Sequence, residues 1–261
     1  MVNVRNPAVA GLFYPDDPRE LRAVLTGYLA AAPAGGGVPK AIIVPHAGYI
    51  YSGPIAASAY ARLKPARGTI TRVVLLGPAH RVGFRGLALP SADYFVTPLG
   101  RIAVDREAVA KISALPQVHV KDVAHAQEHS LEVHLPFLQE VLGEFQLVPL
   151  VVGDAEAEEV GEVLDILWGG PETLIVISSD LSHYYDYRTA QRLDRATSEA
   201  IEQLRSEDID YDSACGRNPV NGLLHVARKL GLKAETIDLR NSGDTAGSRD
   251  RVVGYGAYVV G

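Results

Sequence analysis

Four short, uninterrupted apolar runs constrain the fold of this chain more than any other feature of its sequence. They are rich in Val, Ile and Leu and lie at Ala41–Val44, Thr71–Leu76, Gln146–Val152 and Thr173–Ile177. Apolar runs that do not alternate with polar residues are typical of strands buried on both faces of a sheet. Because helix-like segments separate these runs, we expect one mixed sheet with helices on both faces, in a single α/β domain spanning residues 1–261.

The expected helices are marked by capping residues and apolar stripes. Asp17 is a good N-cap, Pro18 suits the first helical position, and Glu20 can complete a capping box. A helix of small residues lies between the first two apolar runs, and longer ones are expected near Ala190–Leu204 and Val220–Leu230. The last segment, RVVGYGAYVV, predicts a closing strand.

Charge and hydropathy exclude two classes of partner. The chain has 25 Lys and Arg residues against 31 Asp and Glu residues, and the basic residues are scattered rather than clustered. This pattern argues against nucleic-acid binding. No apolar stretch approaches the roughly 18–20 residues needed to span a bilayer, and the first residues lack the apolar core of a signal peptide. We therefore expect a cytoplasmic protein without a membrane partner.

Polar residues follow three of the apolar runs closely. His46 comes after the first run, His80 after the second, and Asp180 and His183 after the last. In open α/β sheets, ligands bind beyond the carboxyl ends of the strands, so we expect these side chains to meet at one edge of the sheet. A lone loop histidine is usually only a satisfied polar residue. Three strand ends with the same chemistry indicate a functional site instead.

The only cysteine, Cys215, lies just before an expected helix. Asn218 and Pro219 are predicted to be the N-cap and the first residue of that helix. The positive end of the helix, together with Arg217, would lower the pKa of the thiol and favour the thiolate. Thiolate and neutral imidazole are good ligands for iron, copper and zinc. Cys215 is therefore a candidate metal ligand, and the alternative is a quiet buried hydrophobe.

A further histidine-rich segment, HAQEHSLEVHLPFL, contains His125, His129 and His134. It is not an HExxH zinc motif, because no glutamate lies between two histidines four residues apart. His129 and the preceding Glu128 are candidates for the pocket. His134 is the weaker candidate and can be purely structural.

Five motifs occur in a fixed order: PHAGYIYSG, GPAH, EHSLEVHLPFL, SSDLSHY and CGRNPVNGLL. With these motifs the chain resembles the Memo family, nearly from end to end. That family is similar in fold to the class III extradiol dioxygenases, which are non-haem iron enzymes, and the resemblance implies the same fold here. The family is also encoded beside an AMMECR-type protein and a radical-SAM protein, in the AmmeMemoRadiSam grouping. The resemblance thus implies these two proteins as partners.

The resemblance also implies roles for individual residues. His46, His80 and Cys215 match the metal positions of the family, with iron (Fe²⁺) as the first choice and copper or zinc as alternatives. His183 matches the catalytic histidine of the dioxygenases, and Asp180 lies beside it. The ring-cleaving enzymes have a carboxylate where Cys215 stands. A thiolate is softer, which favours Cu(I), Zn or a differently tuned iron.

The leading hypothesis is a dioxygenase-like, metal-dependent oxidoreductase of unknown substrate. In it His183 moves a proton and Asp180 orients His183. One alternative is a non-catalytic module that binds a small molecule, a phosphotyrosyl peptide or another anionic ligand, and another is a scaffold for the AMMECR-type and radical-SAM partners. The expected ligand-contacting residues are Phe13 and Tyr51, which match the aromatic pocket residues of the Memo family, together with Glu128, His129 and Arg217.

Overall fold

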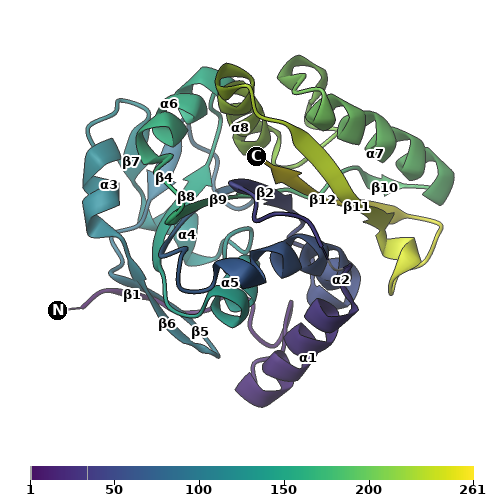
Figure 1. Cartoon of the computed structure of the whole chain (residues 1–261), viewed down its shortest axis with the longest axis horizontal. Coiled ribbons are helices and arrows are strands. Elements are labelled where there is room, and N and C mark those ends of the chain that lie inside the picture. The colour runs from purple at the N-terminus through teal and green to yellow at the C-terminus, as the bar shows by residue number, and fades with distance from the viewer. Residues whose placement is uncertain (1, 34) are drawn as a thin grey trace.

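The computed structural model, which describes residues 2–33 and 35–261, is built on a twelve-stranded mixed sheet (Figure 1). Four parallel strands form its centre, in the order β8, β3, β9 and β2. They are the four apolar runs of the sequence, and all their residues are buried except the first residues of β3 and β8. The predicted α/β fold is confirmed. The bounds of these strands are Gln146–Val152 (β8), Arg72–Pro78 (β3), Thr173–Ser178 (β9) and Ala41–Val44 (β2).

The other strands extend this centre on both sides. On one side β12 pairs antiparallel with β2 and is itself paired with β10 and β11. On the other side β6 and β4 pair with β8, and β5, β1 and β7 continue from them. Their bounds are Val252–Val260 (β12), His183–Tyr185 (β10), Ala234–Asn241 (β11), Gly100–Val104 (β6), Leu87–Leu89 (β4), Tyr94–Thr97 (β5), Val4–Arg5 (β1) and Val118–Val120 (β7).

Helices cover both faces of the sheet (Figure 1). The first face carries α1, α2 and α5, and the second carries α6, α7 and α8. Among the described residues, no helix has both the length and the apolar character required to cross a bilayer. The bounds are Pro18–Ala31 (α1), Tyr49–Tyr60 (α2), Leu135–Leu142 (α5), Ala157–Leu167 (α6), Tyr187–Glu202 (α7) and Arg217–Leu230 (α8), with the short helices Arg106–Ile112 (α3) and Asp122–Ala126 (α4).

Two predicted helix starts differ in detail from the structure. Asp17 caps α1 by accepting the N–H groups of Arg19 and Glu20, each at 2.9 Å, but no capping box is formed within the described residues. Helix α8 begins at Arg217, earlier than predicted, with Gly216 as its N-cap. Asn218 does not cap it, because its side-chain amide donates to the carbonyl of Gly153 at 2.8 Å.

Three loops at one edge of the sheet carry the polar residues singled out above. His46, His80 and Asp180 each lie two residues beyond the end of a parallel strand, β2, β3 and β9 respectively. Because these strands are parallel and β9 lies between the other two, their carboxyl ends meet at the same edge. The topology therefore places the three residues side by side.

Candidate metal centre

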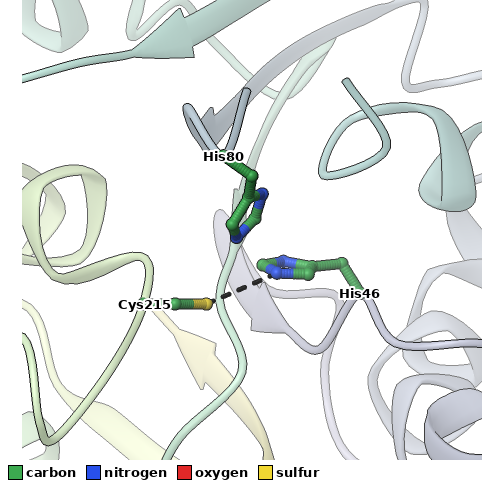
Figure 2. A group of neighbouring side chains, drawn as sticks. All are labelled: His46, His80 and Cys215. Atoms are coloured by element: carbon green, nitrogen blue, oxygen red, sulfur yellow. Dashed lines mark hydrogen bonds between the residues drawn. The ribbon is translucent and has the colours of Figure 1, made fainter. Parts of the chain in front are cut away.

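Three side chains of types that can ligate a metal converge at this edge from distant parts of the chain (Figure 2). His46, His80 and Cys215 each offer one ligand atom, and these atoms all lie within 4.8 Å of one another. The Cys215 sulfur is 3.4 Å from Nε2 of His46. His46 is buried, Cys215 is half-buried and His80 is exposed, so the group can be reached from the surface. Metal–ligand bonds of about 2.0–2.3 Å require only a small contraction of this arrangement.

The start of α8 is docked against the end of β9, and this contact positions Cys215. The backbone N–H of Gly216 donates to Oγ of Ser179 at 3.0 Å, and that of Cys215 donates to the carbonyl of Asp180 at 3.3 Å. A Cβ atom on Gly216 would lie 2.4 Å from the carbonyl oxygen of Ser178. Glycine is therefore required for this close approach, and it brings the sulfur beside the two imidazoles.

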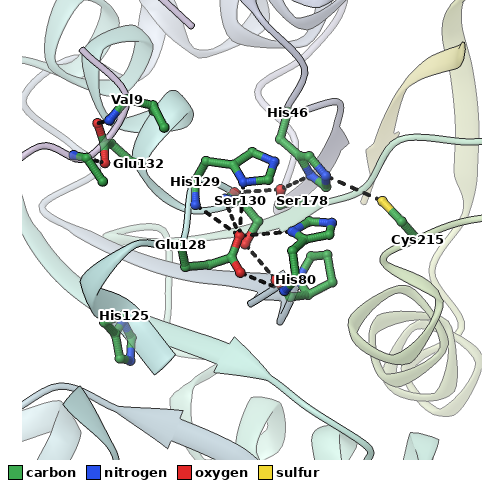
Figure 3. A network of polar contacts seen from close by, with 12 residues as sticks. Val9, His46, His80, His125, Glu128, His129, Ser130, Glu132, Ser178 and Cys215 are labelled. Atoms are coloured by element: carbon green, nitrogen blue, oxygen red, sulfur yellow. Dashed lines mark hydrogen bonds and ion pairs between the residues drawn. The ribbon is translucent and has the colours of Figure 1, made fainter. Parts of the chain in front are cut away.

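His80 is held by the buried carboxylate of Glu128. The carboxylate accepts a hydrogen bond from Nδ1 of His80 at 2.9 Å (Figure 3). It accepts three more, at 2.6–3.0 Å, from the backbone N–H groups of His80, His129 and Ser130. Burial alone would raise the pKa of Glu128, but the hydrogen bonds from His80 and the backbone lower it to about 2. An ionised carboxylate fixes the Nδ1 proton of His80 and leaves Nε2 free to bind a metal.

His46 is held by its backbone and by its ring. Its N–H donates to Oδ1 of Asp180 at 2.7 Å, and Nδ1 lies 2.7 Å from Oγ of Ser178, the last residue of β9. Burial lowers the pKa of His46 well below its usual range, so the ring is neutral at pH 7, as a metal ligand must be. Sequence reasoning did not single out Ser178, because its contact with His46 joins segments that are far apart in the sequence.

Asp180 and His183 do not form the predicted pair. Within the described residues Asp180 makes no hydrogen bond to His183, because its carboxylate faces the backbone of His46. Burial raises the pKa of Asp180 to about 6. His183 starts β10, is partly exposed, and is not among the donors that lie within 4.8 Å of one another. Its charge still acts on Asp180, since it lowers the pKa of that carboxyl.

His129 lies against both candidate histidine ligands. Its ring stacks on that of His80 at a centroid distance of 4.7 Å and meets that of His46 edge-on at 5.4 Å. The ring of Phe13 also packs against His129, at a centroid distance of 4.8 Å. His80, Glu128 and His129 also form a second group of donors within 4.8 Å. Since the Glu128 carboxylate already accepts four hydrogen bonds, we assign this group to supporting His80.

The N-terminal segment anchors the loop that carries Glu128 and His129. The buried carboxylate of Glu132 forms an ion pair with Arg5 and accepts a hydrogen bond from the N–H of Ala8 at 2.8 Å. It also accepts one from the N–H of Val9 at 3.0 Å (Figure 3). The Tyr14 hydroxyl also donates to it, at 2.6 Å. These contacts fix the segment that presents Phe13 to His129. No pattern in the sequence predicted this anchor.

The predicted electrostatics of Cys215 are wrong. Burial raises the pKa of its thiol, and the neighbouring carboxylate of Asp180 raises it further. The guanidinium of Arg217 does not offset this effect, because it packs on the ring of Tyr211 at 3.6 Å from the ring centre. The thiol lines a hollow of about 220 Å³ together with Tyr211 and Phe84. Without metal, Cys215 is therefore a protonated thiol at neutral pH.

The remaining predicted residues lie outside the donor group. Tyr51 is on α2 and is 36% exposed, so it is available at the surface near Gly48 and Phe13. His134 is buried and binds Tyr60 and Ser178 through its two ring nitrogens. Burial lowers its pKa to about 3, so it is neutral at pH 7. It is thus linked to His46 through Ser178, a connection that the sequence did not reveal.

Comparisons with known proteins cover nearly the whole chain. The family model described as Memo-like protein matches residues 5–259. A MEMO1 family protein of Aquifex aeolicus is 39% identical over 97% of this chain and 98% of its own length. One of Methanococcoides burtonii is 35% identical over 98% of this chain and 100% of its own length. Among solved structures, an uncharacterized protein from Escherichia coli K12 matches with 14% identity and a TM-score of 0.49, over 82% of this chain and 98% of that chain.

Proposed function

The chain belongs to the Memo family, and we propose that it binds one transition-metal ion through His46, His80 and Cys215 for redox chemistry. The observation that carries this proposal is the convergence of three donors, two imidazoles and the sole thiol, within 4.8 Å. Iron is the first choice, and copper and zinc are the alternatives. Neutral imidazole and thiolate together suit all three metals.

The donors fit such an ion in protonation as well as in position. A metal requires an unprotonated ring nitrogen and a thiolate. The Nδ1 atoms of His80 and His46 are engaged by Glu128 and Ser178, which leaves both Nε2 atoms available. The thiol of Cys215 must lose its proton when the metal binds. Three protein ligands leave coordination positions for water or substrate.

When bound, the metal supplies Lewis-acid and redox activation of a molecule at its open positions. Asp180 supplies acid–base chemistry beside it, since its Oδ2 atom is 3.9 Å from Nε2 of His46. Its pKa, raised by burial to about 6, lets this carboxyl take up and release a proton near neutral pH. His183 acts on this carboxyl through its charge, which lowers the pKa of Asp180.

A binding module for anionic or phosphotyrosyl ligands has less support. Two carboxylates, Glu128 and Asp180, lie beside the candidate ligands, and the first is ionised because hydrogen bonds lower its pKa to about 2. A second anion there would be repelled unless a metal were bound. The one arginine predicted to face the ligand, Arg217, is stacked on Tyr211.

Metal titration of the anaerobically purified protein tests this proposal. Fe(II), Cu(I) or Zn(II) should bind to the wild type at about one ion per chain, as elemental analysis and competition with a chromophoric chelator would measure. His46→Ala, His80→Ala and Cys215→Ser should each abolish this tight binding. His119→Ala is the matched control, because His119 is exposed on β7. If these three single-site variants bind metal as tightly as the wild type, the assignment is refuted.

A further inference from the structure

A buried chain of hydrogen-bonded side chains leads from the candidate metal ligand His46 into the core. It runs from His46 through Ser178 and His134 to Tyr60, and all four residues are at least 98% buried. We propose that Ser178 and His134 are positioning residues, which fix the ring of His46 as the tautomer whose Nε2 atom is free to bind the metal. This inference rests on the proposed metal site.

The proton on Ser178 can be placed from its three contacts, of which Figure 3 shows those with Ser130 and His46. Its Oγ atom is 2.6 Å from the carbonyl oxygen of Ser130, which can only accept, so the hydroxyl donates there. Its two lone pairs then face Nδ1 of His46 at 2.7 Å and Nε2 of His134 at 2.8 Å. A hydroxyl has only one proton, so both ring nitrogens must be donors.

The same reasoning places the protons on the other side chains of this hydrogen-bonded series. With its proton on Nδ1, neutral His46 has a bare Nε2 atom, and this atom faces the sulfur of Cys215 at 3.4 Å. With its proton on Nε2, neutral His134 has a bare Nδ1 atom, which accepts the hydroxyl of Tyr60 at 2.9 Å. Every donor in this hydrogen-bonded series then has an acceptor. The arrangement is self-consistent only if His46 presents Nε2 to the metal.

The two histidine ligands are therefore supported in different ways. Glu128 holds Nδ1 of His80 with a charged acceptor, which makes that imidazole a stronger electron donor. Ser178 holds Nδ1 of His46 with a neutral acceptor whose orientation depends on His134. A role in packing alone would require a good fit of Ser178 and His134 but no particular tautomer. The two roles can thus be separated by experiment.

The tautomer of His46 can be measured without any metal. In the wild type, long-range ¹H–¹⁵N NMR spectra should show the Nδ1–H form of His46, and Ser178→Ala should convert it to a mixture of both forms. Ser178→Thr retains a hydroxyl and should restore the wild-type form. Ser198→Ala is the matched control, because its buried hydroxyl also makes two hydrogen bonds, to Asp194 and Tyr258, away from the site.

Metal affinity gives the second readout. Loss of a group that orients a metal ligand typically weakens binding by about 10–100-fold. Ser178→Ala should show a loss of this size, and Ser178→Thr and Ser198→Ala should bind within a few-fold of the wild type. If Ser178→Ala does not fold, Tyr60→Phe keeps the ring and should still shift the tautomers of His134 and, more weakly, of His46.

The outcomes separate this inference from the proposed function. If wild-type protein binds no metal but the tautomer of His46 depends on Ser178, the proposed function fails and the hydrogen-bond assignment stands. If the wild type binds metal and Ser178→Ala keeps both the Nδ1–H form and the wild-type affinity, the positioning role is overturned. An unchanged His134 tautomer in a folded Tyr60→Phe protein would equally count against it.

Discussion

The thiol of Cys215 is protonated in the metal-free protein, because burial and the nearby carboxylate of Asp180 both raise its pKa. A helix start favours a thiolate only where the sulfur remains solvated enough for its charge to be tolerated. Here the docking of α8 against β9 removes that solvation. The proton on Cys215 therefore competes directly with a metal for the sulfur.

Metal binding near pH 7 should release about one proton per ion, that of the Cys215 thiol, because this thiol must ionise whereas the ring of His46 is already neutral. Affinity should accordingly rise about tenfold per pH unit around neutrality. Calorimetric titration in buffers of different ionisation enthalpy measures the proton count. Cys215→Ser is the control and should remove the proton release. Binding without any proton release would exclude the neutral thiol as the source of the ligand.

Glu128→Gln should weaken metal binding by about 10–100-fold, because an amide cannot accept the Nδ1 proton of His80 as strongly as an ionised carboxylate. The chelator competition assay measures this loss. Glu140→Gln is a suitable control, since the side chain of Glu140 forms an ion pair with Arg22 at the surface, away from the site. An affinity unchanged by Glu128→Gln would show that the orientation of His80 does not depend on this carboxylate.

At this scale the sequence predicted part of the site. His46, His80 and Asp180 could be found because each closely follows a recognisable buried strand. Ser178 and His134 could not, since a hydroxyl that bridges rings from distant segments leaves no periodic pattern. The pKa of the Cys215 thiol was predicted to be lowered but is raised. Its burial depends on how α8 docks against β9, and this docking cannot be predicted from the sequence.

At the scale of elements, the contact between α8 and β9 decides whether the site forms. The N-terminal residues of α8 lie against the last residues of β9, and Gly216 allows this approach. The strands themselves were predictable from their apolar runs. The start of α8 was misplaced because Asn218 and Pro219 resemble a helix start, whereas Asn218 binds the carbonyl of Gly153 instead.

Gly216→Ala should disturb the proposed metal site more than the small size of the added methyl group suggests. The added Cβ would lie 2.4 Å from the Ser178 carbonyl oxygen and 2.6 Å from the Ser179 side chain, so α8 must shift. We expect a stability loss of about 1–3 kcal/mol and a large loss of metal affinity. Gly27→Ala is the control, because Gly27 lies on α1 with no atom within 4 Å of the added Cβ, and it should stabilise α1 by about 0.5–1 kcal/mol. Thermal unfolding and metal titration measure both effects.

At the scale of the whole molecule, the buried ionisable groups set the response to pH. Burial lowers the pKa of four histidines, so each is neutral in the folded protein and takes up a proton on unfolding below about pH 6.5. They are His46 (well below its usual range), His125 and His129 (to about 4) and His134 (to about 3). These groups make the folded state less stable as the pH falls.

Two buried aspartates act in the opposite direction. Burial raises the pKa values of Asp180 and Asp194 to about 6, so near pH 5 each is protonated when folded and loses its proton on unfolding. Four histidines that gain a proton outweigh two aspartates that lose one, which leaves a net uptake of about two protons. The free energy of unfolding of the metal-free protein should therefore fall by roughly 2–3 kcal/mol per pH unit near pH 5. Urea denaturation between pH 5 and 7 would reveal this slope, and a stability that rises on acidification would contradict it.

The most direct test of the account is to locate a bound metal by anomalous diffraction from crystals of anaerobically loaded protein. The predicted result is one peak at the edge of the sheet beyond β2, β3 and β9. It should lie about 2.0–2.3 Å from Nε2 of His46, Nε2 of His80 and the sulfur of Cys215. A metal bound instead between His80, Glu128 and His129, with Cys215 outside its coordination shell, would contradict the account.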